Sequence, residues 1–82
     1  MQEAEVRDRI RTMIRTGELP CDETGTAWAG KGEGKLCAAC MEPIPPTEIE
    51  FEVVLPSGTP IRLHRLCQII WWEECEPSAP AI

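Results

Sequence analysis

The first apolar pattern along the chain has helical spacing and lies in residues 1–16. Its apolar positions, spaced i, i+4, i+7 and i+8, are Val6, Ile10, Met13 and Ile14. This spacing is typical of an amphipathic helix, and Gly17 follows as a natural left-handed stop. Four arginines lie on the other faces. We predict an N-terminal helix that either packs on the rest of the domain or serves for docking or dimerisation, with an acidic partner for the arginines.

A period of two replaces the helical pattern later in the chain. The alternating positions, apolar first and then acidic, are Ile49, Phe51, Val53 and Leu55 with Glu50 and Glu52. Such alternation predicts a half-buried strand with its glutamates facing solvent. A return strand is expected over residues 59–64, where the apolar positions are Ile61 and Leu63.

The register of this hairpin follows from the pattern. Val53 and Ile61 can share the buried face only if they are paired, which leaves residues 56–58 as a three-residue loop. Loops of this length use a left-handed residue, and Gly58 supplies it. The same register places Glu52 opposite Arg62, as a predicted cross-strand ion pair.

Residues 65–76 are predicted to form a closing helix that ends at Pro77. Its expected inward stripe is Leu66, Ile69 and Ile70. Trp71 and Trp72 are about 100° apart on a helix, so we expect one in the core and the other exposed as a contact residue, the alternative being that both cap the core. Residues 77–82 are expected to be a disordered tail.

Residues 17–35 follow neither pattern and contain five of the six glycines. We expect a glycine-rich loop that lets backbone wrap around a neighbouring site. It is not a phosphate loop, because Gly30 and Gly34 have three residues between them instead of four and no Lys-Ser or Lys-Thr follows. Trp28 either anchors this loop to the core or is an exposed contact residue.

The candidate chemistry lies in two pairs of metal-binding residue types. The sequence Cys37-Ala-Ala-Cys40 is followed, after 23 residues, by His64-Arg-Leu-Cys67. Three thiols and an imidazole form the four-donor set that tetrahedral structural zinc prefers. We predict one structural Zn²⁺, which would contribute much of the folding free energy of a chain this small.

Two further cysteines lie outside this pattern. Cys75 is eight residues beyond Cys67, about two helical turns, and is therefore too far to join the same metal. We expect Cys21 and Cys75 to be small buried or idle thiols. The alternatives are an oxidisable pair, or a metal ligand that replaces His64.

The order of knuckle, hairpin and ligand-bearing helix over residues 36–76 resembles the treble-clef zinc finger. The spacing Cys-x₂-Cys-x₂₃-His-x₂-Cys is similar to the first zinc module of a LIM domain. A LIM domain continues into a second module, whereas no second ligand set follows Cys67 here. Met41 stands where such knuckles commonly carry glycine, and a left-handed residue there costs about 1 kcal/mol. The layout is also similar to small bacterial proteins of unknown function. The resemblance implies an α+β fold, bound zinc and macromolecular binding.

Charge and composition restrict the partners. The formal net charge of −6 argues against nucleic acid, because an acidic protein gains little from counterion release. We expect no signal peptide and no membrane span, since the longest apolar run near the end of the chain is far too short. Reduced cysteines then favour a cytoplasmic protein.

Four matched ligands leave no open metal position, so we do not expect an enzyme. The leading interpretation is a small protein-interaction or adaptor module with a protein partner. Its candidate contact residues are Trp28, Trp71 and Trp72. The alternatives are a nucleic-acid-associated regulatory zinc finger and a thiol/zinc redox sensor.

Overall fold

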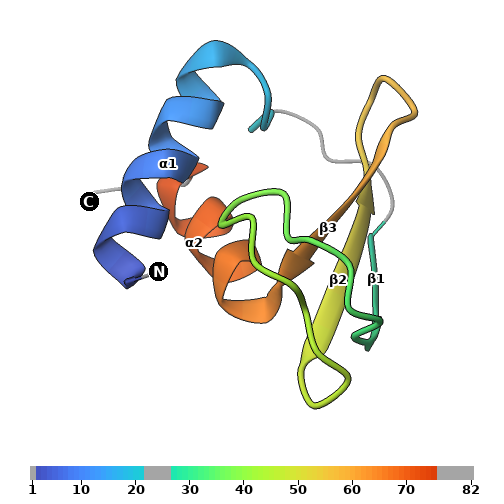
Figure 1. Cartoon of the computed structure of the whole chain (residues 1–82). Helices are drawn as coiled ribbons and strands as arrows, with labels where there is room; N and C mark the ends of the chain where they lie inside the picture. Colours follow the sequence, from blue (N-terminus) through green and yellow to red (C-terminus); the bar gives the residue numbers. More distant parts are fainter. Residues whose placement is uncertain (1, 22–26, 76–82) are drawn as a thin grey trace.

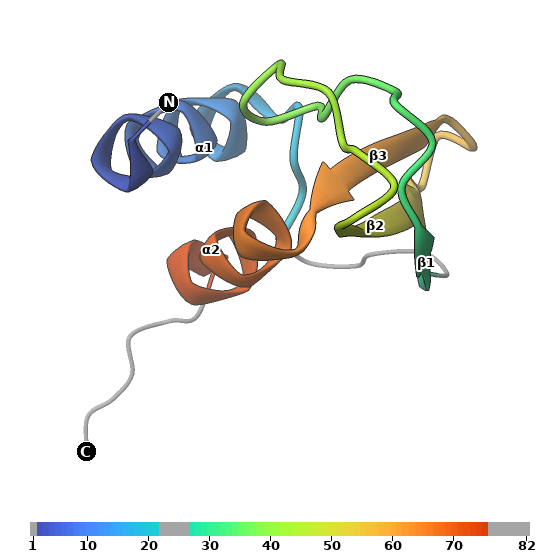
Figure 2. The same ribbon diagram turned by 60° about the horizontal axis from the view of Figure 1, so that its bottom comes forward.

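The computed structural model describes residues 2–21 and 27–75 and has an α+β fold. The elements in chain order are α1 (Glu3–Thr16), β1 (Ala27–Lys31), β2 (Ile49–Val54), β3 (Pro60–His64) and α2 (Arg65–Cys75). The three strands form an antiparallel sheet in the order β1-β2-β3. Helix α1 packs on α2, and α2 packs on β2 and β3 (Figures 1 and 2). The predicted tail at residues 77–82 lies outside the described residues.

Helix α1 confirms the first pattern. Val6 and Ile10 are buried, and Met13 and Ile14 pack partly against the core. Gly17 ends the helix in the left-handed conformation at φ 88°. The helix therefore packs on the rest of the domain, which is the first of the two predicted alternatives.

The predicted hairpin register is confirmed. Val53 pairs with Ile61, and Gly58 has a φ of 93° in the connecting loop. Arg62 reaches Glu52 only at 3.8 Å, whereas its Nε donates to Glu50 Oε2 at 3.0 Å. The cross-strand pair thus forms with a different principal partner from the one predicted.

The prediction of a glycine-rich loop over residues 17–35 is wrong for residues 27–31, which form the edge strand β1. Trp28 lies opposite Glu52, and Gly30 lies opposite Glu50. Alanine and glycine have weak β propensity, so this segment shows no strand pattern of its own. It becomes a strand because β2 offers it unpaired backbone donors and acceptors.

The additional strand also changes burial on β2. Glu50, predicted to face solvent, is only 7% exposed, because β2 is the central strand and is flanked on both sides. Ile49, predicted to be buried, begins the strand and is 46% exposed. Leu66, predicted to point inward from the closing helix, is 48% exposed, so this prediction is wrong as well.

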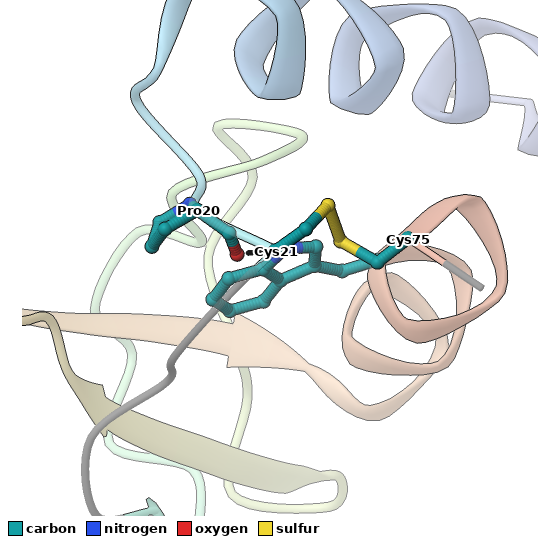
Figure 3. The surroundings of a disulfide bond; sticks show 4 residues. Pro20, Cys21 and Cys75 are labelled. Atoms are coloured by element: carbon teal, nitrogen blue, oxygen red, sulfur yellow. Dashed lines mark hydrogen bonds between the residues drawn. A yellow bond between two sulfur atoms is a disulfide. The ribbon is translucent and has the colours of Figure 1, made fainter. Parts of the chain in front are cut away.

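The two spare cysteines form a disulfide that joins the segment after α1 to the last residue of α2 (Figure 3). The prediction of idle thiols is therefore wrong, and the alternative of an oxidisable pair is confirmed. The premise that all cysteines are reduced, which favoured the cytoplasm, does not hold for Cys21 and Cys75. Beside the bridge, Trp71 Nε1 donates a hydrogen bond to Pro20 O at 3.1 Å.

Ion pairs hold the same two helices together. Glu74 accepts hydrogen bonds from Arg7 Nη1 and from Arg11 Nε, both at 2.7 Å. Glu73 accepts a further one from Arg7 at 2.9 Å. The acidic end of α2 opposes its own helix dipole, and its use is to bind the arginines of α1. In the part of the chain that the structure describes, no helix is long and apolar enough to cross a bilayer.

Candidate metal centre

The four predicted ligands come together from three parts of the fold. Cys37 and Cys40 lie in the turn between β1 and β2, His64 ends β3, and Cys67 lies in the first turn of α2. One ligand atom from each residue can be chosen so that all four lie within 4.8 Å of one another. Because β3 ends at His64 and α2 begins at Arg65, His64 and Cys67 lie close together although one is in a strand and the other in a helix.

Hydrogen bonds shape the knuckle that carries the first pair. The amide of Met41 donates to Cys37 O at 2.9 Å, and the amide of Ala39 donates to Cys37 Sγ at 3.4 Å. Met41 adopts the left-handed conformation at φ 65°, in the position where glycine is usual. The amide of Ala38 donates to Arg62 O at 2.8 Å, which fixes the knuckle to β3.

His64 is oriented as a metal ligand. Its Nδ1 lies 3.3 Å from Cys40 Sγ, inside the cluster. Its Nε2 lies 3.1 Å from Pro43 O and 3.8 Å from Glu48 Oε1. A carbonyl can only accept, so the proton belongs on Nε2, and the lone pair of Nδ1 then faces the three sulfurs. Ligating histidines commonly have such a partner for their second nitrogen.

Ionisation of one of the three thiols disfavours ionisation of the other two. The pKa of Cys37 is lowered because its sulfur accepts a hydrogen bond from the Cys67 thiol. The pKa of Cys67 is raised because it donates that bond and because it is buried, and burial also raises the pKa of Cys40. Without a cation, one thiolate therefore keeps protons on its neighbours. A divalent ion reverses this preference and allows all three to ionise.

The donor set fits zinc. All three sulfurs belong to buried residues, and a tetrahedral zinc site with sulfur ligands has edges of about 3.8 Å, comparable to the spread of the ligand atoms. Three sulfurs and one nitrogen are soft and borderline donors that favour zinc over magnesium or calcium. A metal held here would connect the knuckle, the sheet and α2.

An open groove of about 580 Å³ lies beside the cluster. Cys40, His64 and Cys67 form one part of its lining. The apolar part of the lining consists of Val6, Ile49, Leu66 and Ile69. Sequence reasoning does not find this groove, because its lining comes from α1, the loop before β2, the start of β2, the end of β3 and α2, and because Ile49 and Leu66 are predicted to be core residues.

The three tryptophans proposed as contact residues have different environments. Trp71 is fully buried, so its assignment to an interaction surface is wrong. Trp72 is more than half exposed, which confirms that the core takes only one of this pair. Trp28 is also more than half exposed, on β1, and is therefore not an anchor to the core.

Comparisons of the chain with protein-family models, with curated proteins and with solved structures return no match.

Proposed function

We propose that this chain is a structural zinc module that presents a surface to another protein. The observation that supports it most strongly is the convergence of Cys37, Cys40, His64 and Cys67, whose ligand atoms lie within 4.8 Å of one another. Four protein donors fill a tetrahedral shell and leave no position for water or substrate. A closed shell supports a structural metal and a role in binding over a role in catalysis.

The arrangement of the ligands supports a treble-clef plan. A knuckle carries two ligands, a hairpin follows, and the last ligand lies in the first turn of α2. Strand β1 and helix α1 are additions to that plan. The bond from Pro43 O to the ring of His64 supplies the outer-shell support that metal-binding histidines use.

The other two functions receive less support. Three arginines, Arg7, Arg11 and Arg62, are paired with carboxylates of the same chain, which weakens the case for a basic surface that binds nucleic acid. The disulfide uses Cys21 and Cys75 and leaves the metal cluster intact. Oxidation of Cys21 and Cys75 to a disulfide therefore leaves all four candidate metal ligands available.

Cobalt substitution tests the zinc proposal directly. Cobalt(II) in a tetrahedral site with three sulfurs has strong visible and near-ultraviolet absorption, which zinc should displace. We expect this spectrum from the native chain at one metal per chain, and its loss in Cys40→Ser. The matched control is Cys21→Ser, which removes a cysteine outside the cluster and should retain the spectrum. An unchanged spectrum in Cys40→Ser would reject this set of ligands.

A further inference from the structure

The two edges of the sheet differ in how well they are covered. On the outer side of β3, Arg62 O accepts a hydrogen bond from the amide of Ala38 in the knuckle at 2.8 Å. Pro60, at the start of the same strand, has no amide proton to offer. Strand β1 forms the opposite edge (Figure 1). Among residues 2–21 and 27–75, none forms a hydrogen bond with the outer side of β1.

The hydrogen-bond pattern shows which backbone groups of β1 point outward. In an antiparallel pair, alternate residues of a strand direct both N–H and C=O toward the same neighbouring strand. Gly32 donates to Glu48 O at 3.0 Å and continues the register of β1 and β2, so every second residue before Gly32 bonds to β2. The residues between them direct their backbone groups away from the sheet. These residues, all exposed, are Ala27, Ala29 and Lys31.

Strand β1 is complementary to its own sequence. An open edge pairs readily with another extended strand, and two copies of β1 paired antiparallel about Ala29 leave no residue of Ala27–Lys31 without a partner. The outward-directed residues then exchange hydrogen bonds across the interface. Trp28 of each copy lies directly opposite Gly30 of the other, and an aromatic ring that covers a glycine stabilises an edge strand. This register therefore gives the exposed indole of Trp28 a contact.

Charge does not oppose this pairing, although the chain has a net charge of −6. Between residues 27 and 35 the sequence has one acidic residue, Glu33, and two lysines, Lys31 and Lys35. In the register about Ala29, Lys31 lies opposite Ala27 of the other copy. No two like charges are then directly opposite one another in the paired strands, which is the arrangement that would destabilise them.

We propose that two copies of this chain join through β1, about a two-fold axis at Ala29, so that their two three-stranded sheets form one continuous antiparallel sheet. Association stops at the dimer, because the pairing is self-complementary and the knuckle covers the other edge of each sheet. The interface is short, so the dimer is weak and its population depends on concentration. This inference goes beyond the proposed function, and it uses none of the metal ligands.

Sedimentation equilibrium and hydrogen exchange of the zinc-loaded chain, from micromolar to millimolar concentration, test the proposal. The average mass should rise from one chain toward two. Over the same range the amides of Ala29 and Lys31 should gain protection from exchange, because they become bonded only in the dimer. The amides of Trp28 and Gly30 are bonded to β2 in each copy and should change less. A monomer at every concentration, or a dimer without this alternation, would overturn the proposal.

An NMR measurement on a mixture of isotope-labelled and unlabelled chains reports the register. In the proposed pairing, Trp28 and Gly30 of different copies form a pair without hydrogen bonds, in which the Cα atoms lie about 4.5 Å apart. A filtered nuclear Overhauser effect between the Hα atoms of these two residues is therefore expected. Within one strand the same two residues are too far apart to give it. Intermolecular contacts confined to other residues would overturn the β1 interface.

The chain offers a closely matched pair of variants. Trp28 and Trp72 are 54% and 53% exposed, but only Trp28 lies on β1. Trp28→Ser should raise the dissociation constant of the dimer at least about tenfold, because each dimer loses two buried indole contacts. Trp72→Ser should leave the dissociation constant unchanged. Equal effects of the two variants, or a larger effect of Trp72→Ser, would reject the proposal.

A proline at position 29 tests the backbone contribution. The N–H of Ala29 points outward, and proline is tolerated on a sheet edge at such a position. Ala29→Pro removes this donor and places its ring where the second copy would pair, so the variant should stay monomeric at every concentration. Metal content and spectral dispersion are measured first, to show that the variant is folded. Undiminished dimerisation of folded Ala29→Pro would overturn the proposal.

Discussion

At the scale of single residues, Gly32 shows how closely the backbone packs near the cluster. Its amide donates to Glu48 O at 3.0 Å, just beyond the end of β1. A Cβ placed on Gly32 would lie 2.6 Å from Ile44 O and would also collide with Pro45 O. Both obstacles are backbone atoms, which cannot turn away as a side chain can. This position therefore requires glycine for space.

We predict that Gly32→Ala destabilises the zinc-loaded chain by about 1–3 kcal/mol, the usual cost of overpacking. Gly30→Ala is the matched control, because nothing lies within 4 Å of a Cβ at that position. Denaturant unfolding of both variants measures the difference. Equal stability of the two variants would contradict the close approach of residues 44–45 to this turn.

The metal ligands were predictable residue by residue, because each ligand is separated from another ligand by two intervening residues, and a pair with that spacing can be recognised in the sequence alone. The burial of Glu50 was not. Its partner Arg62 lies 12 residues away, and its burial depends on a strand that the pattern did not reveal. Alternation along one strand indicates two faces, but it does not indicate how well each face is covered.

At the scale of elements, the disulfide and the ion pairs hold α1 against α2. The bridge between Cys21 and Cys75 closes a loop with a sequence separation of 54. In the chain-entropy account, a loop of that length stabilises the folded state by about 4 kcal/mol. The double variant Cys21→Ser/Cys75→Ser should lose roughly this amount in denaturant unfolding and still bind one zinc. Loss of zinc from this variant would contradict the separation of the two cysteine groups.

The Glu74 carboxylate is the second link between these helices. Hydrogen bonds from Arg11 and Arg7 lower its pKa below the ordinary value of 4.5. A lowered folded-state pKa means that its stabilisation is present above about pH 4.5 and is lost as the pH falls below it. Glu74→Gln should therefore destabilise the chain at pH 7, and the difference from wild type should shrink toward pH 4.

Thermal unfolding of both proteins at each pH measures that difference, and any loss of stability common to both cancels. Glu73→Gln is the control, because Glu73 is more exposed and accepts from Arg7 alone. Its effect at pH 7 should be the smaller. A larger effect in the control would contradict the role assigned to Glu74.

The elements that the sequence predicted well were those with a period of their own. Both helices and the β2–β3 hairpin have one, and the structure confirms the register of the hairpin and the Gly17 cap of α1. Strand β1 has no hydrophobic period of its own. Ala27-Trp28-Ala29-Gly30 becomes a strand only through pairing with β2. The disulfide was equally unpredictable, since a sequence does not give the distance between Cys21 and Cys75.

At the scale of the whole molecule, the proposed zinc connects the knuckle, the end of β3 and the start of α2. Its four ligands are separated by up to 30 residues along the chain, from Cys37 to Cys67. The remaining core is small, because an 82-residue chain buries a limited share of its surface. The metal should therefore dominate the stability of residues 36–75, while the disulfide retains a link between α1 and α2.

The most direct measurement is native mass spectrometry of the purified chain before and after a chelator, paired with an NMR fingerprint spectrum. We predict one zinc per chain, and a loss of dispersed resonances from residues 36–75 when the zinc is removed. A chain that carries no metal and gives the same dispersed spectrum with and without chelator would contradict the structural zinc centre.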